Sequence, residues 1–293
     1  MVWQSMLRHW LGQQARAKVF EAARQRAEGG SRPAERPAPC DVGLVFALGM
    51  ELGGLEDLLQ GVVTMRGQDF IARQGSLQGR SLVLIESGVG FEAAARGTQA
   101  LIGGHRPPWV ISAGFAGGLD PQVARGDILM VDSLCEAGGR QLSIDLKVSP
   151  ESLAGRPGVH VGRLLSIDAV VHRPEEKRAL GAAHSALAVD MESWAVGEVC
   201  RQAKVRFLAV RIITDAVDDR LPRDVEKLAR QKTRAARLGA AAGAVFRRPS
   251  SLKDMLKLKE QALVASDRLA QFLAGMIVQL VPAAEEAGGE QAT

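Results

Sequence analysis

Residues 188–196, "AVDMESWAV", place two acidic residues between two apolar runs. We expect a buried strand before Asp190 and a buried helix after Glu192, and strand–helix steps of this kind build a sheet that helices cover. Burying an ionised carboxylate costs free energy unless a partner compensates for it. Glu192 needs no functional explanation if its charge merely favours the N-terminus of the helix.

Apolar runs of strand length recur through the middle of the chain, and helical patterns such as "FEAAARGTQALIGG" and "SWAVGEVCRQA" lie between several of them. The runs cover residues 42–48, 81–87, 109–114, 127–133, 186–191 and 207–214. Continuous apolar strands that alternate with helices indicate a sheet buried on both faces. We therefore predict an α/β fold with a mixed, largely parallel twisted sheet flanked by helices and with helical extensions at both ends.

We expect one globular domain with additions at its ends. The domain is assigned to residues 41–246, a basic amphipathic helix and linker to 1–40, a C-terminal helical extension to 247–282, and a disordered tail to 283–293. Apolar residues at helical spacing in the extension predict packing against the domain or against another subunit. They are Leu252, Met255, Leu256, Leu263, Leu269 and Leu273. We expect no apolar run long enough to span a bilayer.

The formal net charge of +4 belongs to the N-terminal segment. Residues 1–40 hold seven Lys or Arg and three Glu, so residues 41–293 carry 30 basic and 30 acidic side chains. Aromatic residues make up only 4% of the chain, and tyrosine is absent. A neutral domain with few aromatic side chains argues against binding to nucleic acid.

The N-terminal segment has an apolar helical stripe beside its basic residues, formed by Trp3, Met6, Leu7, Trp10 and Leu11. Such a helix can lie on an anionic membrane surface or dock on the protein's own domain. The apolar run is too short for a secretory signal. We predict a cytoplasmic protein, with peripheral membrane contact through residues 1–30 as an open alternative.

Cysteine and histidine are sparse. Three cysteines (Cys40, Cys135 and Cys200) and five scattered histidines show neither a disulfide framework nor metal-ligand spacing. A reducing compartment fits this composition, and we predict no metal site.

Three carboxylates and two glycine-rich turns follow predicted strands. Glu51 comes after residues 42–48, Glu192 after 186–191, and Asp215 after 207–214. Ligands of open α/β sheets bind at the carboxyl ends of the strands, so we expect these side chains to meet at one rim. Each also has a purely structural explanation: Glu51 can cap a helix, Asp215 can start a turn, and the glycines can shape tight loops.

One motif in this region is misleading. Residues 88–93, "GVGFEA", match the dinucleotide-binding pattern G-x-G-x-x-A, but the acidic residue expected about 20 positions later is missing. We therefore predict no nicotinamide, flavin or other cofactor. Phe115 stands where a nucleophile elbow needs a serine, and no Walker A lysine is present.

The chain resembles the nucleoside phosphorylases and nucleosidases, particularly the methylthioadenosine/S-adenosylhomocysteine nucleosidase type. Five fragments fall in the family's order over roughly residues 42–235: "VGLVFALGMELGGL", "ESGVGFEAAARG", "ISAGFAGGLDPQVARGDILMVDS", "AVDMESWAVGEVC" and "VRIITDAVD". The resemblance implies a nucleoside phosphorylase-like catalytic domain. The segment "FRRPSSLKDMLKLKEQALVASDRL" is similar to the hopanoid-associated branch of the family.

The resemblance also implies roles for individual residues. Asp215 matches the acid that protonates purine N7, Glu51 the carboxylate that activates the attacking water, and Glu192 the group that binds the ribose 2′ and 3′ hydroxyls. Further positions that match substrate-binding residues are Met191 against the sugar, Val170 and Val171 at the base edge, and Val89, Gly114 and Phe115 in the glycine-rich turns.

The chain departs from the family at the phosphate site. Ser112 and Phe115 stand where hexameric phosphorylases carry an arginine and a serine, which favours water over phosphate as the nucleophile. Val170 stands where an aromatic residue of nucleosidases stacks on the purine, so the specificity for adenine is open. Phe115 either fills the phosphate space or lines a pocket for a bulky 5′ substituent.

We therefore expect a nucleosidase that hydrolyses a 5′-substituted purine nucleoside, with adenine as the favoured base. Methylthioadenosine, S-adenosylhomocysteine and a lipophilic compound such as adenosylhopane are the candidate substrates. A phosphorylase and a non-catalytic nucleoside sensor are the alternatives. The family resemblance implies a homo-oligomer of unspecified order.

Overall fold

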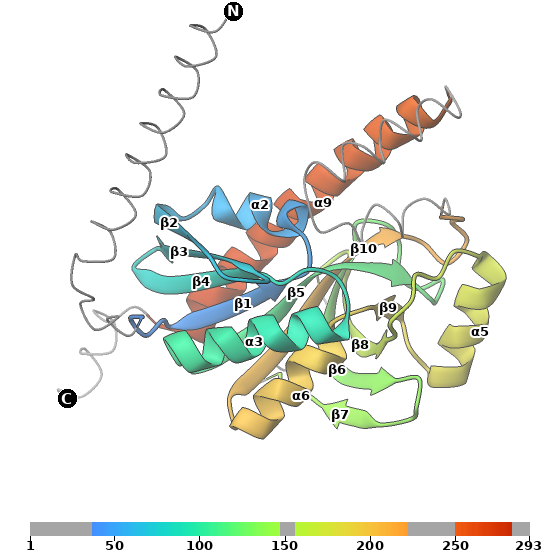
Figure 1. Cartoon of the computed structure of the whole chain (residues 1–293). Helices are drawn as coiled ribbons and strands as arrows, with labels where there is room; N and C mark the ends of the chain where they lie inside the picture. Colours follow the sequence, from blue (N-terminus) through green and yellow to red (C-terminus); the bar gives the residue numbers. More distant parts are fainter. Residues whose placement is uncertain (1–36, 147–155, 222–249, 283–293) are drawn as a thin grey trace, which may run out of the picture. The chain divides into compact units, whose positions relative to one another are not determined.

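The computed structural model describes residues 37–146, 156–221 and 250–282, and only the backbone of residues 250–259 (Figure 1). Several expectations lie outside the described residues. They are the amphipathic stripe and linker before residue 37, the side chains of Leu252, Met255 and Leu256, and the disorder of the C-terminal tail.

The described residues form a ten-stranded mixed sheet, in which the main path runs β10-β6-β8-β9-β5-β1-β4-β3-β2 and β7 pairs with β6. The strands are β1 (Val42–Phe46), β2 (Gln60–Arg66), β3 (Ile71–Leu77), β4 (Arg80–Glu86), β5 (Trp109–Gly118), β6 (Ile128–Glu136), β7 (Gln141–Ser143), β8 (Val159–Ser166), β9 (Ala188–Asp190) and β10 (Arg206–Asp215).

The centre of the sheet is parallel. Strands β4, β1, β5 and β10 pair in parallel, whereas β2 and β3 add an antiparallel edge. Strand β10 also pairs antiparallel with β6, and the ladders through β8 and β9 return to β5, so five strands close a ring. The predicted class, a mixed α/β sheet flanked by helices, is confirmed.

Helices cover the two faces of the sheet. Helices α3 (Phe91–His105) and α6 (Ser193–Ala203) pack together on one face, and α2 (Gly49–Glu56) packs on α9 (Ser250–Leu280) on the other (Figure 1). Helix α5 (Pro174–His184) packs beside β8 and β9, where its Leu180 contacts a small cluster that includes Leu165 and Val189 (Figure 1).

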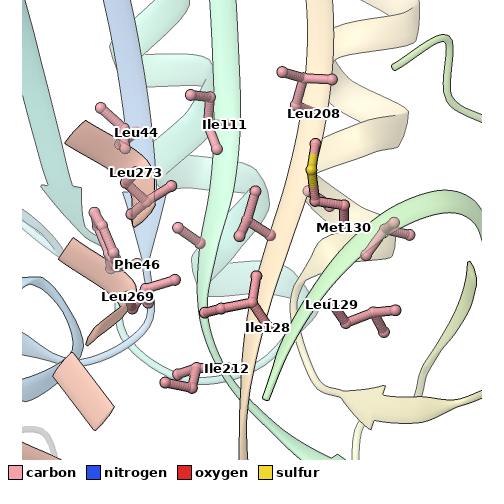
Figure 2. Packing of buried hydrophobic residues seen from close by; sticks show 14 of the residues in the cluster. Leu44, Phe46, Ile111, Ile128, Leu129, Met130, Leu208, Ile212, Leu269 and Leu273 are labelled. Carbon is pink, nitrogen blue, oxygen red and sulfur yellow. The ribbon is translucent and has the colours of Figure 1, made fainter. Parts of the chain in front are cut away.

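Successive side chains of the central strands belong in turn to two separate hydrophobic cores. Leu44 and Ile111 belong to the larger core with Leu273 of α9, and Figure 2 shows these three side chains close together. Their chain neighbours Val45 and Val110 point into the second core, beneath α3 and α6. Because successive strand residues face opposite sides, a strand buried on both sides needs a continuous apolar run.

The described part of α9 belongs to the body of the protein. Leu269 and Leu273 are fully buried in the larger core, as the first alternative predicted, but Leu263 is 51% exposed. By length and composition alone, Glu260–Leu280 is apolar enough to cross a membrane, contrary to the sequence expectation. In this structure its inner face packs on the sheet and on α2.

Candidate functional site

A cavity of about 1080 Å³ opens at the carboxyl ends of the central parallel strands. Residues that follow or end β1, β4, β5 and β10 line one side, and residues of α9 from Glu260 to Arg268 line the other. The position agrees with the general location of ligand sites in open α/β sheets.

Eight of the nine positions singled out in the sequence line this cavity: Glu51, Val89, Phe115, Val170, Val171, Met191, Glu192 and Asp215. Gly114 does not line the cavity itself but lies next to Glu51, which does. A Cβ atom added there would stand 2.7 Å from Glu51 Oε1, so only glycine lets this carboxylate approach the strand. The three carboxylates, far apart in the chain, therefore meet around one cavity.

Glu51 holds α2 against the end of β5. Its Oε2 accepts a hydrogen bond of 2.8 Å from the Leu48 amide, which caps the helix, and its Oε1 accepts one of 2.9 Å from the Phe115 amide. Burial raises the pKa of Glu51, while these amides and the positive charge of Arg211 oppose the rise. The capping role is real, but it uses only part of the carboxylate's capacity, because each oxygen can accept more than one hydrogen bond.

Glu192 stands at the start of α6 yet makes no side-chain cap there. Its Oε1 instead accepts a hydrogen bond of 2.8 Å from the amide of Gly90, the residue that precedes α3. Burial, followed by the negative charges of Asp190 and Glu51, raises the pKa of Glu192 to about 8. The helix-start explanation therefore does not account for this side chain.

Asp190, rather than Glu192, accepts a hydrogen bond from the first turn of α6. Its Oδ2 accepts hydrogen bonds from the Ser193 amide (3.0 Å) and from Nη2 of Arg211 (2.7 Å), and its Oδ1 accepts one from Ser166 Oγ (2.5 Å). Arg211 is 2% exposed and also donates to Ser112. This buried network satisfies both charges, as buried ion pairs require.

Asp215 ends β10 and is 5% exposed. Thr214 Oγ1 donates to its Oδ1 at 3.0 Å, and the ammonium group of Lys177 donates to its Oδ2. Burial raises the pKa of Asp215, and the charge and hydrogen bond of Lys177 oppose the rise. A buried carboxyl group with a raised pKa can hold a proton for transfer to a ligand.

Sequence reasoning missed Lys177, Arg211 and the contribution of α9 to the cavity wall. A charged residue inside the apolar run "FLAVRIIT" was a visible signal for Arg211. Lys177 stands in "PEEKRAL", which has the composition of a solvated helix, so its burial left no signal in the sequence.

Nothing in the described ranges 37–146, 156–221 and 250–282 suits a metal ion, since no cluster of three or more His, Cys, Asp or Glu side chains occurs there. All three cysteines are buried free thiols. The polar side chains that line the cavity include the three carboxylates, Thr214, Arg125 and Arg268.

The fold and the cavity define an α/β protein with a small-molecule site at the carboxyl ends of its central strands. Residues 41–157 and 148–245 match the Phosphorylase superfamily, and the chain belongs to this family. The family predicted from the sequence is confirmed at this level, whereas the hopanoid-associated branch stays a prediction.

Solved structures with the same fold include methylthioadenosine/S-adenosylhomocysteine nucleosidases. The enzyme from Neisseria meningitidis, in complex with methylthio-immucillin-A, is 21% identical, with 82% of this chain and 99% of that chain covered and a TM-score of 0.64. The S-adenosylhomocysteine nucleosidase from Streptococcus pyogenes is 19% identical (86% and 100% covered, TM-score 0.63). The nucleosidase from Colwellia psychrerythraea, solved with adenine, is 20% identical (83% and 96% covered, TM-score 0.61). At these identities the likeness concerns the fold.

Proposed function

We propose that this protein hydrolyses the N-glycosidic bond of a 5′-substituted purine nucleoside with adenine as the base. The observation that carries the proposal is the meeting of Glu51, Glu192 and Asp215 around one cavity of a phosphorylase-superfamily fold. Methylthioadenosine, S-adenosylhomocysteine and adenosylhopane are the candidate substrates.

Asp215 is the proposed acid. Cleavage breaks the bond between C1′ and the base nitrogen, and its electron pair leaves with the base, so the base must gain a proton while the sugar becomes oxocarbenium-like. Burial raises the pKa of Asp215 and so favours the protonated form that an acid requires. Its proton passes to purine N7, and Asp215 is left as a carboxylate.

Glu51 is the proposed base. It takes a proton from the water whose oxygen forms the new bond to C1′. The Leu48 and Phe115 amides fix the plane of its carboxyl group, so the remaining acceptor positions have a defined direction. The same amides and Arg211 oppose the rise that burial causes in the pKa of Glu51.

Glu192 is the proposed binding group for the ribose. A carboxyl side chain with one backbone donor, Gly90, keeps acceptor positions for the vicinal 2′ and 3′ hydroxyls. Met191, on the same wall, offers an apolar contact for the sugar ring. This use explains why a costly buried carboxyl group stands beside Asp190, which already serves the fold.

The backbone amides of the glycine-rich turns favour hydrolysis over phosphorolysis, because two of them already donate to carboxyl groups. A glycine-rich turn can cradle phosphate through its N–H groups, but those of Phe115 and Gly90 already donate to Glu51 and Glu192. Glu51 lies at that turn, and in its ionised form it repels a phosphate dianion. Water meets no such barrier.

The size and lining of the cavity support a bulky, apolar 5′ substituent. Ligand cavities commonly measure about 300–1000 Å³, so a cavity of about 1080 Å³ is large for a nucleoside alone. Phe115, Val264 and Ala265 contribute apolar surface to it. A lipophilic nucleoside such as adenosylhopane fits this description better than a small one.

The test is chromatography of the products from a panel of adenosine derivatives with different 5′ groups, with and without phosphate. We expect free adenine and free sugar at the same rate in both conditions. Sugar 1-phosphate formed only with phosphate would indicate a phosphorylase. Binding without release of the base from any derivative would indicate a nucleoside sensor and would refute the proposal.

A further inference from the structure

Lys177 is a buried cation beside the candidate active site. It lies on α5, its side chain is fully buried, and its ammonium group contacts Asp215 Oδ2, the Ala216 carbonyl oxygen (2.8 Å) and the Asp219 carbonyl oxygen (3.0 Å). These three acceptors use all three donors of the ammonium group. Full satisfaction is what a buried charge needs, and here it fixes one position for Nζ.

The charge of Lys177 acts on Asp215. Of the three oxygens that Nζ contacts, only that of Asp215 belongs to an ionisable group. The carboxylate of Asp219 pairs with Arg125 (2.7 Å) and accepts from the Ala216 amide (2.7 Å). Its negative charge opposes that of Lys177 and raises the pKa of Asp215. On the side of β5, Asp215 pairs with Gly117, which brings no charge.

Resting on the function proposed above, we propose that Lys177 is a positioning residue that makes Asp215 a stronger acid toward the departing base. As the bond to the base breaks, the proton of Asp215 moves to N7, and the carboxylate that remains forms a full ion pair with Lys177, which keeps its own protons throughout. Without a cation in this apolar place, the new carboxylate would be left uncompensated. The same contact fixes the carboxyl plane for transfer.

A merely structural role for Lys177 makes a different prediction. Its bonds to Ala216 and Asp219 tie α5 to the loop after β10, so its loss would also lower stability. Such a loss would change the amount of folded protein or the binding of substrate, but it would not move the pH at which the acid titrates.

The experiment measures kcat and kcat/KM against pH for Lys177→Met and Lys177→Gln, with adenine release as the readout. Removing a neighbouring cation raises the pKa of an acid, so we expect the alkaline limb of both variants to move upward by about one pH unit or more. We expect kcat near neutral pH to fall at least about tenfold, because a weaker acid transfers its proton less readily. Arg178→Met, an exposed change on the same helix, should leave both quantities unchanged.

The double variant Asp215→Asn/Lys177→Met separates action through Asp215 from an independent role. If Lys177 acts only through Asp215, the double variant loses no more activity than Asp215→Asn alone. A further loss in the double variant, or an alkaline limb that stays in place in folded single variants, would overturn the inference.

Lys177→Arg covers the case in which the uncharged variants fail to fold, because it keeps the cation. It should retain the alkaline limb of the wild type and most of its kcat, and a shifted limb in a folded Arg variant would count against the inference. If the wild-type protein releases no base at all, the proposed function itself fails and this inference fails with it.

Discussion

Two acidic residues two positions apart, Asp190 and Glu192, show how the surroundings of a side chain assign its task. Asp190 is matched by Arg211 and by serine and amide donors, so its charge is part of the fold. Glu192 is buried with one backbone donor and two negative neighbours, which destabilises its charged form. A buried acidic side chain that the fold does not need is a candidate for binding a ligand.

The raised pKa of Glu192 predicts a specific pH dependence of stability. The folded state holds the proton up to about pH 8, whereas an unfolded glutamate loses it near its ordinary value of 4.5. Stability therefore falls as pH rises between these two values, by at most about 1.4 kcal/mol per pH unit. Glu192→Gln removes this loss, so the variant should match the wild type near pH 5 and exceed it by at least about 1 kcal/mol near pH 8.

Urea unfolding of both proteins across this pH range measures the difference. Glu92→Gln, on the surface of α3, is the control and should follow the wild type at every pH. A constant difference between Glu192→Gln and the wild type would show that the carboxyl group does not titrate in this range.

Asp215→Asn tests the acid assignment. Asparagine keeps the shape of the side chain but has no proton to transfer to N7, and general acids contribute about 10²–10⁴-fold to a rate. We expect adenine release to fall by at least about 100-fold, while the affinity for the nucleoside stays within about threefold. Single-turnover kinetics and equilibrium binding measure the two effects. Asp218→Asn, an exposed neighbour, should change neither, and base release by Asp215→Asn near the wild-type rate would refute the assignment.

Residues of the candidate site differed in how visible they were in the sequence. Glu51, Glu192 and Asp215 stood out because each follows an apolar strand, where a charge is unusual. Lys177 could not be recognised, because acidic and basic neighbours surround it in the sequence. Its burial depends on which face of α5 meets the sheet, and that is decided by residues remote in the chain.

Secondary structure elements were predictable where their surroundings are uniform. Strands β1, β4, β5, β6 and β10 are buried on both sides and therefore appear as continuous apolar runs. Strand β2 was missed because it is an almost wholly exposed edge strand, and β8 because half-buried polar residues interrupt its apolar pattern. Their strand geometry comes from hydrogen bonding to neighbours, which a single sequence does not display.

Helix α9 supports the site from the far side of the cavity, and its packing can be tested by two leucines on one helix. Leu273 is fully buried and Leu263 is 51% exposed. Leu273→Ala should cost about 2–5 kcal/mol of unfolding free energy, because it leaves a cavity in the larger core, whereas Leu263→Ala should cost about 0.5 kcal/mol or less. Chemical denaturation measures both. Equal small effects would mean that the helix does not pack on the body in solution.

Stability of α9 also bears on the catalytic carboxylate proposed here. Ser266 Oγ accepts a hydrogen bond of 3.0 Å from the Gly54 amide and donates one of 3.2 Å to the carbonyl oxygen of Glu51. The helix that lines the outer wall thus also fixes the backbone of α2, on which Glu51 stands. One element therefore lines the cavity and supports the proposed base.

At the scale of the whole molecule, charge and chemistry are separated along the chain. Residues 41–293 are balanced in charge and hold the carboxylate-lined cavity, whereas the net charge of +4 resides in residues 1–40. A domain without net charge that binds a neutral nucleoside, as proposed above, gains nothing from a basic segment. A basic segment with apolar residues at helical spacing suits a surface that presents both anionic head groups and acyl chains, which is also where a lipophilic substrate would reside.

Neutralising the basic segment tests this membrane hypothesis in the full chain. Each Lys or Arg near an anionic bilayer contributes about 1 kcal/mol, so removing four charges should weaken co-sedimentation with anionic vesicles at least about tenfold. The variant replaces Arg8, Arg16, Lys18 and Arg24 by Gln. The control removes the same number of charges from exposed positions of the body, Arg66, Arg106, Arg156 and Arg220. Turnover of a water-soluble nucleoside should be the same in the wild type and the variant, and equal vesicle binding by variant, control and wild type would mean that the segment docks elsewhere.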